Sequence, residues 1–149
     1  MCSSDLQIAS GKFLMIGAGN NQKSMAYVEN IAAFLRFATT FSSGRHVFNY
    51  IDKPDFTMNE LTDVICTALH RKKNNIRIPY TVGITGGYCL DILSKITGKE
   101  FPVSSIRVKK FCARTQFKSN NIAATGFEAP VTLEQGIANT VRHEFLEKH

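Results

Sequence analysis

Residues 17–24 read GAGNNQKS and contain the groups in this chain best suited to binding phosphate. The phosphate-binding loop of nucleotide hydrolases is G-x-x-x-x-G-K-[ST]. Gly17, Lys23 and Ser24 occupy its first, seventh and eighth positions. The sixth position holds Gln22, where a glycine brings backbone N–H groups close to the phosphates. No strand-ending aspartate for magnesium follows, so the sequence favours a polar turn between a strand and a helix.

Other patterns that could carry chemistry fail on their spacing. The stretch GITGGYC at 83–89 lacks the further glycine of a dinucleotide fingerprint, because Cys89 stands there, and it is interpreted as a helix start or kink. The terminal HEFLEKH at 143–149 does not place a second histidine at zinc-ligand spacing. The chain contains neither G-x-S-x-G nor Tyr-x-x-x-Lys. We therefore assign no catalytic, cofactor-binding or metal-binding residue.

The charge of the chain is concentrated in one region. The net charge is +6, yet residues 71–118 contain eleven Lys or Arg and two acidic residues, which gives that stretch +9 and leaves −3 for the remainder. A local field of this sign favours an anionic partner, such as a nucleic acid, an acidic protein surface or a phosphorylated small molecule.

The cysteine spacing and the hydropathy of the chain indicate in which cellular compartment the protein is expected. The four cysteines, Cys2, Cys66, Cys89 and Cys112, are too far apart for a C-x-x-C pair. Such spacing is typical of reduced thiols in a cytoplasm, which is the location we expect. No apolar run approaches the roughly 18 residues of a membrane helix, so we expect no membrane span.

Hydrophobic periodicity and capping signals predict a mixed α/β fold with about five helices and two or three short strands, in a single domain over residues 1–149. Expected strands lie at 12–17, 46–51 and 76–80, with a turn at 52–56; expected helices lie at 27–41, 57–70, 84–97, 105–112, 119–125 and 133–145.

Several motifs, taken in order, carry a resemblance to a known family. They are a G-x-G-x-N loop at 17–21 that precedes Lys23, the helix start Y-V-E-N-I-A at 27–32, Arg107, the G-F-E-A-P of 126–130 and the T-L-E-Q-G-I of 132–137. In order and spacing, over roughly residues 7–146, the chain resembles the C-terminal part of NAD-dependent nucleotide-sugar epimerases and dehydratases, which are extended short-chain dehydrogenases.

The resemblance implies a mixed α+β substrate lobe that packs against a Rossmann domain. It implies that Lys23 and Arg107 clamp the diphosphate of a UDP-sugar or similar sugar nucleotide, and that Asn20 and Asn21 donate hydrogen bonds to it. Cation pairs suit this task, because arginine binds phosphate oxygens bidentately. NAD is expected in the parent enzyme and not on this chain, which lacks the Rossmann half. Residues 1–6 fit no family pattern, so we expect a fragment that is inactive alone.

An alternative is a basic, non-enzymatic module that binds nucleic acid or an acidic protein through residues 71–77 and 107–118. Nucleic acid is disfavoured, because the sequence shows no aromatic stacking platform. A lobe without its Rossmann partner exposes apolar surface, so self-association is also expected.

Overall fold

The structure is a computed structural model that describes residues 13–99, 101 and 103–146. The elements are β1 (Met15–Ile16), β2 (Gln22–Met25), α2 (Val28–Ala38), β3 (Asp52–Thr57), α3 (Met58–Ala68), β4 (Arg77–Ile78), α4 (Tyr80–Thr97), α5 (Ser105–Cys112), α6 (Asn120–Ala123) and α7 (Leu133–Phe145). The mixed α/β class is confirmed, with six helices and four short strands in the described part. Residues 1–6, expected to lie outside the family pattern, fall outside the described residues.

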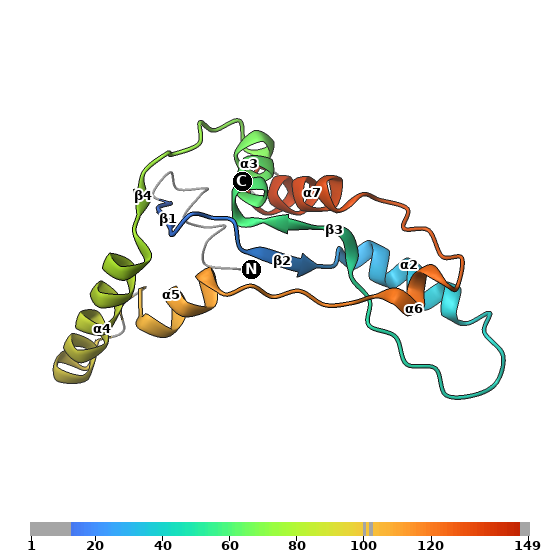
Figure 1. Ribbon diagram of the computed structural model, residues 1–149. Coiled ribbons are helices and arrows are strands. Elements are labelled where there is room, and N and C mark those ends of the chain that lie inside the picture. Colours follow the sequence, from blue (N-terminus) through green and yellow to red (C-terminus); the bar gives the residue numbers. More distant parts are fainter. Residues whose placement is uncertain (1–12, 100, 102, 147–149) are drawn as a thin grey trace.

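The strands form two small sheets. β1 pairs in parallel with β4, and β2 pairs antiparallel with β3. The segment after α5 joins the second sheet through a bridge between Lys23 and Thr115. In Figure 1 the molecule is elongated: α4 and α5 lie at one end, and α2 and α6 lie at the other.

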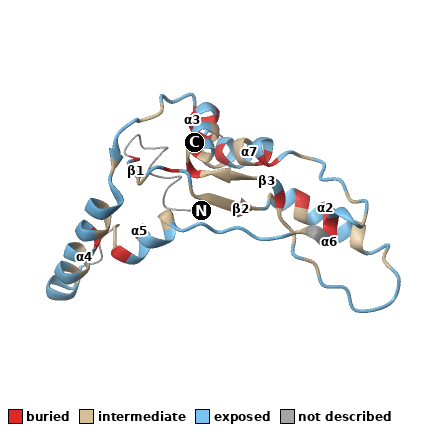
Figure 2. Cartoon of the chain, viewed as in Figure 1, coloured by how far each residue is buried: buried red, intermediate tan, exposed pale blue. Residues whose placement is uncertain are grey.

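The main core lies between β1, α3 and α7. Its buried side chains are Phe13, Met15, Met58, Ile65, Cys66, Ala68, Leu69 and Val141. Figure 2 shows buried positions along both α3 and α7. The predicted capping boxes are present: Thr57 with Glu60 begins α3, and Thr132 with Gln135 begins α7. Such boxes satisfy the first N–H groups of a helix, so they fix where each helix starts.

An aromatic cluster surrounds Phe34 of α2. The ring centroids of Phe48 and Tyr50 lie 5.3 Å and 5.2 Å from that of Phe34. The prediction of a strand at 46–51 is wrong, because these aromatic side chains cover α2 from an irregular segment. The predicted turn at 52–56 is also wrong, because it belongs to β3.

Asn30 joins α2 to two distant segments from inside the protein. It is fully buried, and its Nδ2 donates to Asp52 Oδ1 at 3.0 Å and to the carbonyl oxygen of Val131 at 2.7 Å. Asp52 also accepts the backbone N–H of Tyr27, the residue before α2, at 2.7 Å. The 27–32 motif is therefore a structural junction, and it holds β2 and β3 against the start of α2.

α4 packs closely on β1 and on α5 through two glycines one helical turn apart. A Cβ on Gly83 would lie 2.7 Å from Ile16 Cγ2, and one on Gly87 would lie 2.8 Å from the backbone of Ser105. The predicted helix start or kink at 83–89 is wrong: α4 begins at Tyr80 and continues through both glycines, which form its packing face.

Candidate functional site

An open pocket of about 440 Å³ lies where the loop after β1 meets the first turn of α4 and the last turn of α5. Its lining residues are Ile16, Gly17, Ala18, Gly19, Asn20, Asn21, Tyr80, Lys109, Cys112 and Ala113. Asn20 and Asn21, predicted as ligand-binding residues, are among them. We call residues 17–21 the pocket loop.

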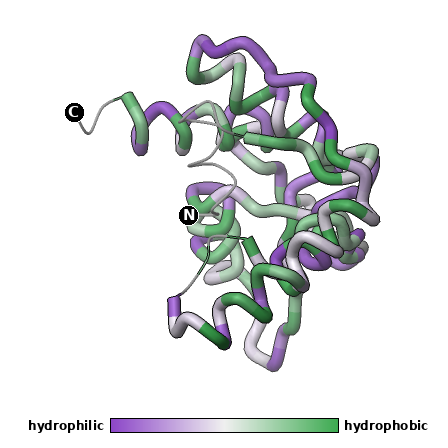
Figure 3. Tube along the Cα trace, turned by 90° about the vertical axis from the view of Figure 1, so that its left-hand side faces the viewer, coloured by the Kyte–Doolittle hydropathy of each residue, from purple (hydrophilic) through white to green (hydrophobic). Residues whose placement is uncertain are grey.

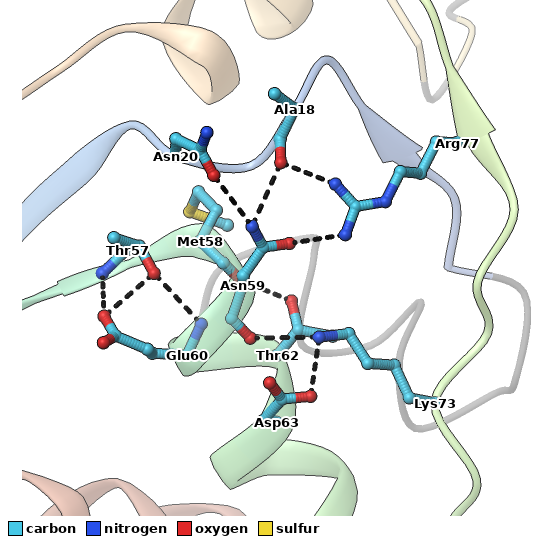
Figure 4. A network of polar contacts seen from close by, with 10 residues as sticks. All are labelled: Ala18, Asn20, Thr57, Met58, Asn59, Glu60, Thr62, Asp63, Lys73 and Arg77. Atoms are coloured by element: carbon cyan, nitrogen blue, oxygen red, sulfur yellow. Dashed lines mark hydrogen bonds and ion pairs between the residues drawn. The ribbon is translucent and has the colours of Figure 1, made fainter.

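The first turn of α3 holds the pocket loop from one side (Figure 4). The backbone N–H groups of Met58 and Asn59 donate to the carbonyl oxygens of Asn21 and Gly19, each at 3.1 Å. The amide of Asn59 donates to the carbonyl oxygen of Ala18 at 3.0 Å and to Asn20 Oδ1 at 3.2 Å. Because N–H groups at a helix start have no partner within the helix, the loop carbonyls satisfy them and the loop is fixed in return.

Arg77 of β4 supports this contact. Its Nη1 donates to the carbonyl oxygen of Ala18 at 2.6 Å, and its Nη2 donates to Asn59 Oδ1 at 3.2 Å. Figure 4 shows the guanidinium beside the loop and Lys73 below it, where Lys73 pairs with Asp63 at 2.6 Å. Two cations of the basic region 71–77 are thus engaged in shaping the pocket loop and α3.

Gly19 is required by the close approach of Asn59. Its φ is +72°, and a Cβ there would lie 2.6 Å from Asn59 Oδ1. An L-residue rarely adopts this φ, and a contact of that length displaces the neighbouring atom. The glycine therefore serves the backbone geometry of the loop and its contact with α3.

The last turn of α5 holds the other end of the pocket loop and the strand that follows it. Asn21 Nδ2 donates to the carbonyl oxygen of Phe111 at 2.8 Å. Lys23 Nζ donates to the carbonyl oxygens of Lys110 at 2.9 Å and Ala113 at 2.6 Å. A cation at a helix C-terminus complements the helix dipole and the carbonyls that lack partners there.

The predicted pair of clamp residues is not assembled in the pocket. Lys23 lies in β2, where a turn was expected, and its ammonium is directed to α5. Arg107 is an exposed residue of α5 that does not line the pocket. It precedes Lys109 by two residues, so their side chains leave the helix about 160° apart. The cation that lines the pocket is Lys109.

Sequence reasoning missed Lys109 and Tyr80, because the crossing of α4 and α5 brings them to the loop. Lys109 Nζ donates to the hydroxyl of Tyr88 at 2.6 Å and lies 5.1 Å from the centre of that ring. The hydrogen bond to Tyr88 raises the pKa of Lys109 above its ordinary value, so the ammonium is charged at neutral pH. The only sequence signal was the basic run at 107–110, which does not single out one lysine.

Cys112 is the one thiol in the pocket lining. Its Sγ contacts the carbonyl oxygen of Ile16 at 3.5 Å. Burial raises the pKa of Cys112, so the thiol stays protonated at neutral pH and is a poor nucleophile. Residues 13–99, 101 and 103–146 contain no group of three His, Cys, Asp or Glu that could hold a metal ion. The pocket is therefore suited to binding by amides and one cation.

The fold of this chain is found in part of known sugar-nucleotide epimerases and dehydratases. Two solved structures share the fold, the UDP-glucose 4-epimerase of Thermotoga maritima and the dTDP-glucose 4,6-dehydratase of Bacillus anthracis. Each superposes with a TM-score of 0.59, over 98% and 99% of this chain and 38% of its own length. The sequence identities are 16% and 17%, so the likeness is one of fold.

A protein from Escherichia coli O157:H7 is similar to this chain in sequence as well. It is N-acetyl-alpha-D-glucosaminyl-diphospho-ditrans,octacis-undecaprenol 4-epimerase, which is 52% identical over 141 residues, or 94% of this chain and 43% of the relative. The chain thus spans less than half of that protein. No family model matches the chain. The predicted resemblance is confirmed: the chain is related to part of an NAD-dependent epimerase/dehydratase of the extended short-chain dehydrogenase family.

Proposed function

We propose that this chain is the lobe of an NAD-dependent epimerase that binds the sugar diphosphate of its substrate. The observation that carries the proposal is the position of the pocket loop, which lines one pocket with Lys109. Asn20 brings an amide group to this pocket and the lysine brings a charge, whereas Asn21 Nδ2 donates to the carbonyl oxygens of Phe111 and Ala113 and so fixes the loop to α5. Amide donors and a cation are the groups that bind phosphate oxygens.

Lys23 has a positioning role in this proposal. It holds α5, and therefore Lys109, at a fixed distance from the pocket loop through its bonds to the helix C-terminus. Direct contact of Lys23 or Arg107 with the diphosphate stays a prediction. A movement of α5 relative to β2 would be needed to bring Arg107 to the pocket.

The relatives suggest which part of the substrate is shared. The E. coli relative is named for a sugar diphosphate joined to undecaprenol, whereas the T. maritima and B. anthracis enzymes are named for sugars joined to nucleotides. The sugar diphosphate is common to all three. The identity of 52% to the E. coli enzyme favours a lipid-linked substrate and a reaction at C4 of the sugar.

The glycines of 83–86 do not form a binding loop for NAD. The glycines of 83–86 lie inside α4 rather than at a turn between a strand and a helix, so they cannot present backbone N–H groups to a pyrophosphate. We assign NAD and the acid–base chemistry to the remainder of the parent enzyme, and we derive no step through the cofactor here. We also propose a cytoplasmic location, consistent with the free thiols Cys66, Cys89 and Cys112.

Calorimetry tests the assignment with UDP-N-acetylglucosamine as a soluble sugar diphosphate. The full chain is titrated alone and with the complementary N-terminal part of the E. coli relative added in trans. Lys109→Ala is expected to weaken binding about tenfold, because a charge-assisted hydrogen bond is lost. The matched control Lys118→Ala removes an exposed lysine that does not line the pocket, and it should have no effect.

Two outcomes would overturn the proposal. One is the absence of binding by the wild-type chain in the presence of its complement. The other is an affinity unchanged in both Lys109→Ala and Asn20→Ala. A gel-shift titration tests the basic-module alternative: tight, steeply salt-dependent binding of DNA or RNA would replace the sugar-diphosphate assignment.

A further inference from the structure

Among the described residues that line the pocket, Lys109 is the one cation, and its ammonium is bonded to a neutral group. Its Nζ donates to the hydroxyl of Tyr88 at 2.6 Å and lies 5.1 Å from the centre of that ring. In the part of the chain that the structure describes, Lys109 takes part in no ion pair, whereas the ammonium groups of Lys53 and Lys73 do. The ammonium in the pocket is therefore held by an acceptor that does not neutralise it.

The crossing of α4 and α5 sets the distance between Tyr88 and Lys109. Gly87 is buried next to Tyr88, and a Cβ there would lie 2.8 Å from the backbone of Ser105, the first residue of α5. Asp91, three residues after Tyr88, accepts the backbone N–H of Ser105 at 3.1 Å. Contacts on both sides of Tyr88 thus fix the start of α5, and Lys109 follows Ser105 by four residues, on the same side of the helix.

The two helices lie beside each other at one end of the molecule (Figure 1), the end that faces the viewer in Figure 3. No helix among the described residues, α4 included, is long and apolar enough to cross a membrane. Tyr80, the first residue of α4, lines the pocket together with Lys109. Tyr88 follows two turns later, about 12 Å along the helix axis, and does not line the pocket. Any effect of Tyr88 on a ligand in the pocket therefore passes through Lys109.

The bond to Tyr88 leaves Lys109 able to bind an anion. An ammonium has three N–H donors, and Tyr88 uses one of them. Two donors and the charge remain for phosphate oxygens. A lysine side chain loses much rotamer freedom when it is held in one place, and this cost weakens ligand binding unless the side chain is already ordered. A carboxylate in the place of Tyr88 would also order the lysine, but it would compete with phosphate for the charge.

We propose that Tyr88 is a positioning residue for sugar-diphosphate binding: its neutral hydroxyl holds the ammonium of Lys109 at the pocket before the ligand arrives and leaves the charge to the ligand. This inference rests on the proposed function and deepens it, because it names a residue outside the pocket on which the affinity depends. If the pair only joined α4 to α5, its loss would change the stability of the protein and leave the affinity of the folded protein unchanged.

Calorimetry measures the effect on binding. The ligand is UDP-N-acetylglucosamine, and the protein is the full chain with the complementary N-terminal part of the E. coli relative. Tyr88→Phe keeps the ring and removes the acceptor, and it is expected to weaken binding about fivefold, because the ammonium must then be ordered by the ligand. In a Lys109→Ala background the same change is expected to have no effect, since Tyr88 acts through Lys109.

Tyr27→Phe is the matched control. It removes the hydroxyl of a tyrosine whose ring packs on Gly136 of α7 and that does not line the pocket. Its affinity should equal that of the wild type.

Tyr88→Glu tests whether the neutrality of the acceptor matters. The carboxylate still accepts from Lys109 but pairs with its charge, so binding should weaken more than in Tyr88→Phe. Thr97→Glu adds the same charge at an exposed position of α4, nine residues further on and on the opposite side of the helix. It should weaken binding less than Tyr88→Glu does.

An NMR titration of the lysine side chains shows whether the bond exists in solution. The hydrogen bond to Tyr88 is the main cause that raises the pKa of Lys109. Tyr88→Phe should therefore lower the pKa of Lys109 toward its ordinary value, and Tyr27→Phe should leave it unchanged.

Four results would overturn the inference: an unchanged affinity in Tyr88→Phe, the same loss from Tyr88→Phe with and without Lys109→Ala, tighter binding by Tyr88→Glu than by Tyr88→Phe, or an unchanged pKa of Lys109 in Tyr88→Phe. The failures of the two proposals can be distinguished. If the wild type binds and Lys109→Ala weakens binding while Tyr88→Phe does not, the proposed function stands and the positioning role is wrong. If the wild type does not bind, the proposed function is wrong, and the positioning role with it.

Discussion

The ammonium of Lys23 donates a hydrogen bond of 2.6 Å to the carbonyl oxygen of Ala113, ninety residues further along the chain. Sequence motifs indicated that this lysine binds phosphate, whereas in the structure it joins β2 to the end of α5. The bond connects the two segments between which the pocket opens, so a change at Lys23 affects the shape of the site even if the lysine never touches a ligand.

Lys23→Met removes this bond and keeps much of the side-chain volume. The free energy of unfolding is expected to fall by about 1 kcal/mol, because one partly exposed donor is lost from the helix C-terminus. Urea unfolding followed by circular dichroism measures the change. Lys118→Met is the control at an exposed position. If Lys23→Met lowers affinity for a sugar diphosphate with no loss of stability, direct phosphate contact is favoured over positioning.

Gly19→Ala tests the contact between the pocket loop and α3. The left-handed φ of +72° alone costs an alanine about 1–2 kcal/mol, and the clash with Asn59 adds to this. Gly98→Ala is the matched control, because Gly98 has φ +67° and a Cβ added there would meet no atom within 4 Å. Thermal unfolding of the two variants should therefore show a larger loss for Gly19→Ala. Equal losses would mean that Asn59 moves aside freely.

Asn30→Ala should be among the most destabilising single changes. It removes an amide that bonds Asp52 and Val131 in the interior, and these partners are then left partly unsatisfied. The expected loss is about 2–3 kcal/mol in urea unfolding. Asn139→Ala, at an exposed position of α7, is the control and should change stability little. A loss below about 1 kcal/mol, the size of a single net hydrogen bond, would show that water replaces the amide.

Asp55 makes stability depend on acid pH. Burial acts to raise the pKa of Asp55, but hydrogen bonds from Lys53, Ser24 and Gln116 outweigh it and hold the pKa below its ordinary value. A lowered folded pKa gives a contribution that is present above the unfolded value of about 3.9 and is lost as the pH falls through the folded value.

Asp55→Asn should therefore destabilise the protein at neutral pH, and its effect should shrink as the pH falls through the folded pKa of Asp55, where the wild-type carboxyl becomes protonated too. Urea midpoints across this pH range provide the measurement. Glu128→Gln, at an exposed position of the loop before α7, is the control. A difference between Asp55→Asn and wild type that is constant with pH would mean that the hydrogen bonds matter and the charge does not.

Local signals predicted the helices well and the strands poorly. Thr57 and Thr132 each begin a helix through bonds three residues away, which the sequence displays directly. The strand at 52–57 contains Pro54 and three charged residues, and it exists because β2 pairs with it. Phe48 and Tyr50 have high strand propensity, but they pack on Phe34 instead, so tertiary contacts outweighed propensity.

For the pocket too, the residues close together in sequence could be predicted, and those brought together by distant contacts could not. Asn20 and Asn21 line the pocket together because the pocket loop is continuous in sequence, and their contact with a ligand stays a prediction. Lys109 and Tyr80 reach the loop only through the crossing of α4 and α5 at Gly87, which no periodicity or spacing reveals. Arg107 was chosen from the same basic helix, but it lies on another side of it.

The close crossing at Gly87 has a mechanical consequence. At Gly87 the backbone of α4 rests on the backbone of α5, and the far end of α5 is held by hydrogen bonds from Asn21 and Lys23. A displacement of α4 that also moves α5 must therefore either break these hydrogen bonds or move the pocket loop with α5. A contact on the outside of α4 would thus change the shape of the pocket.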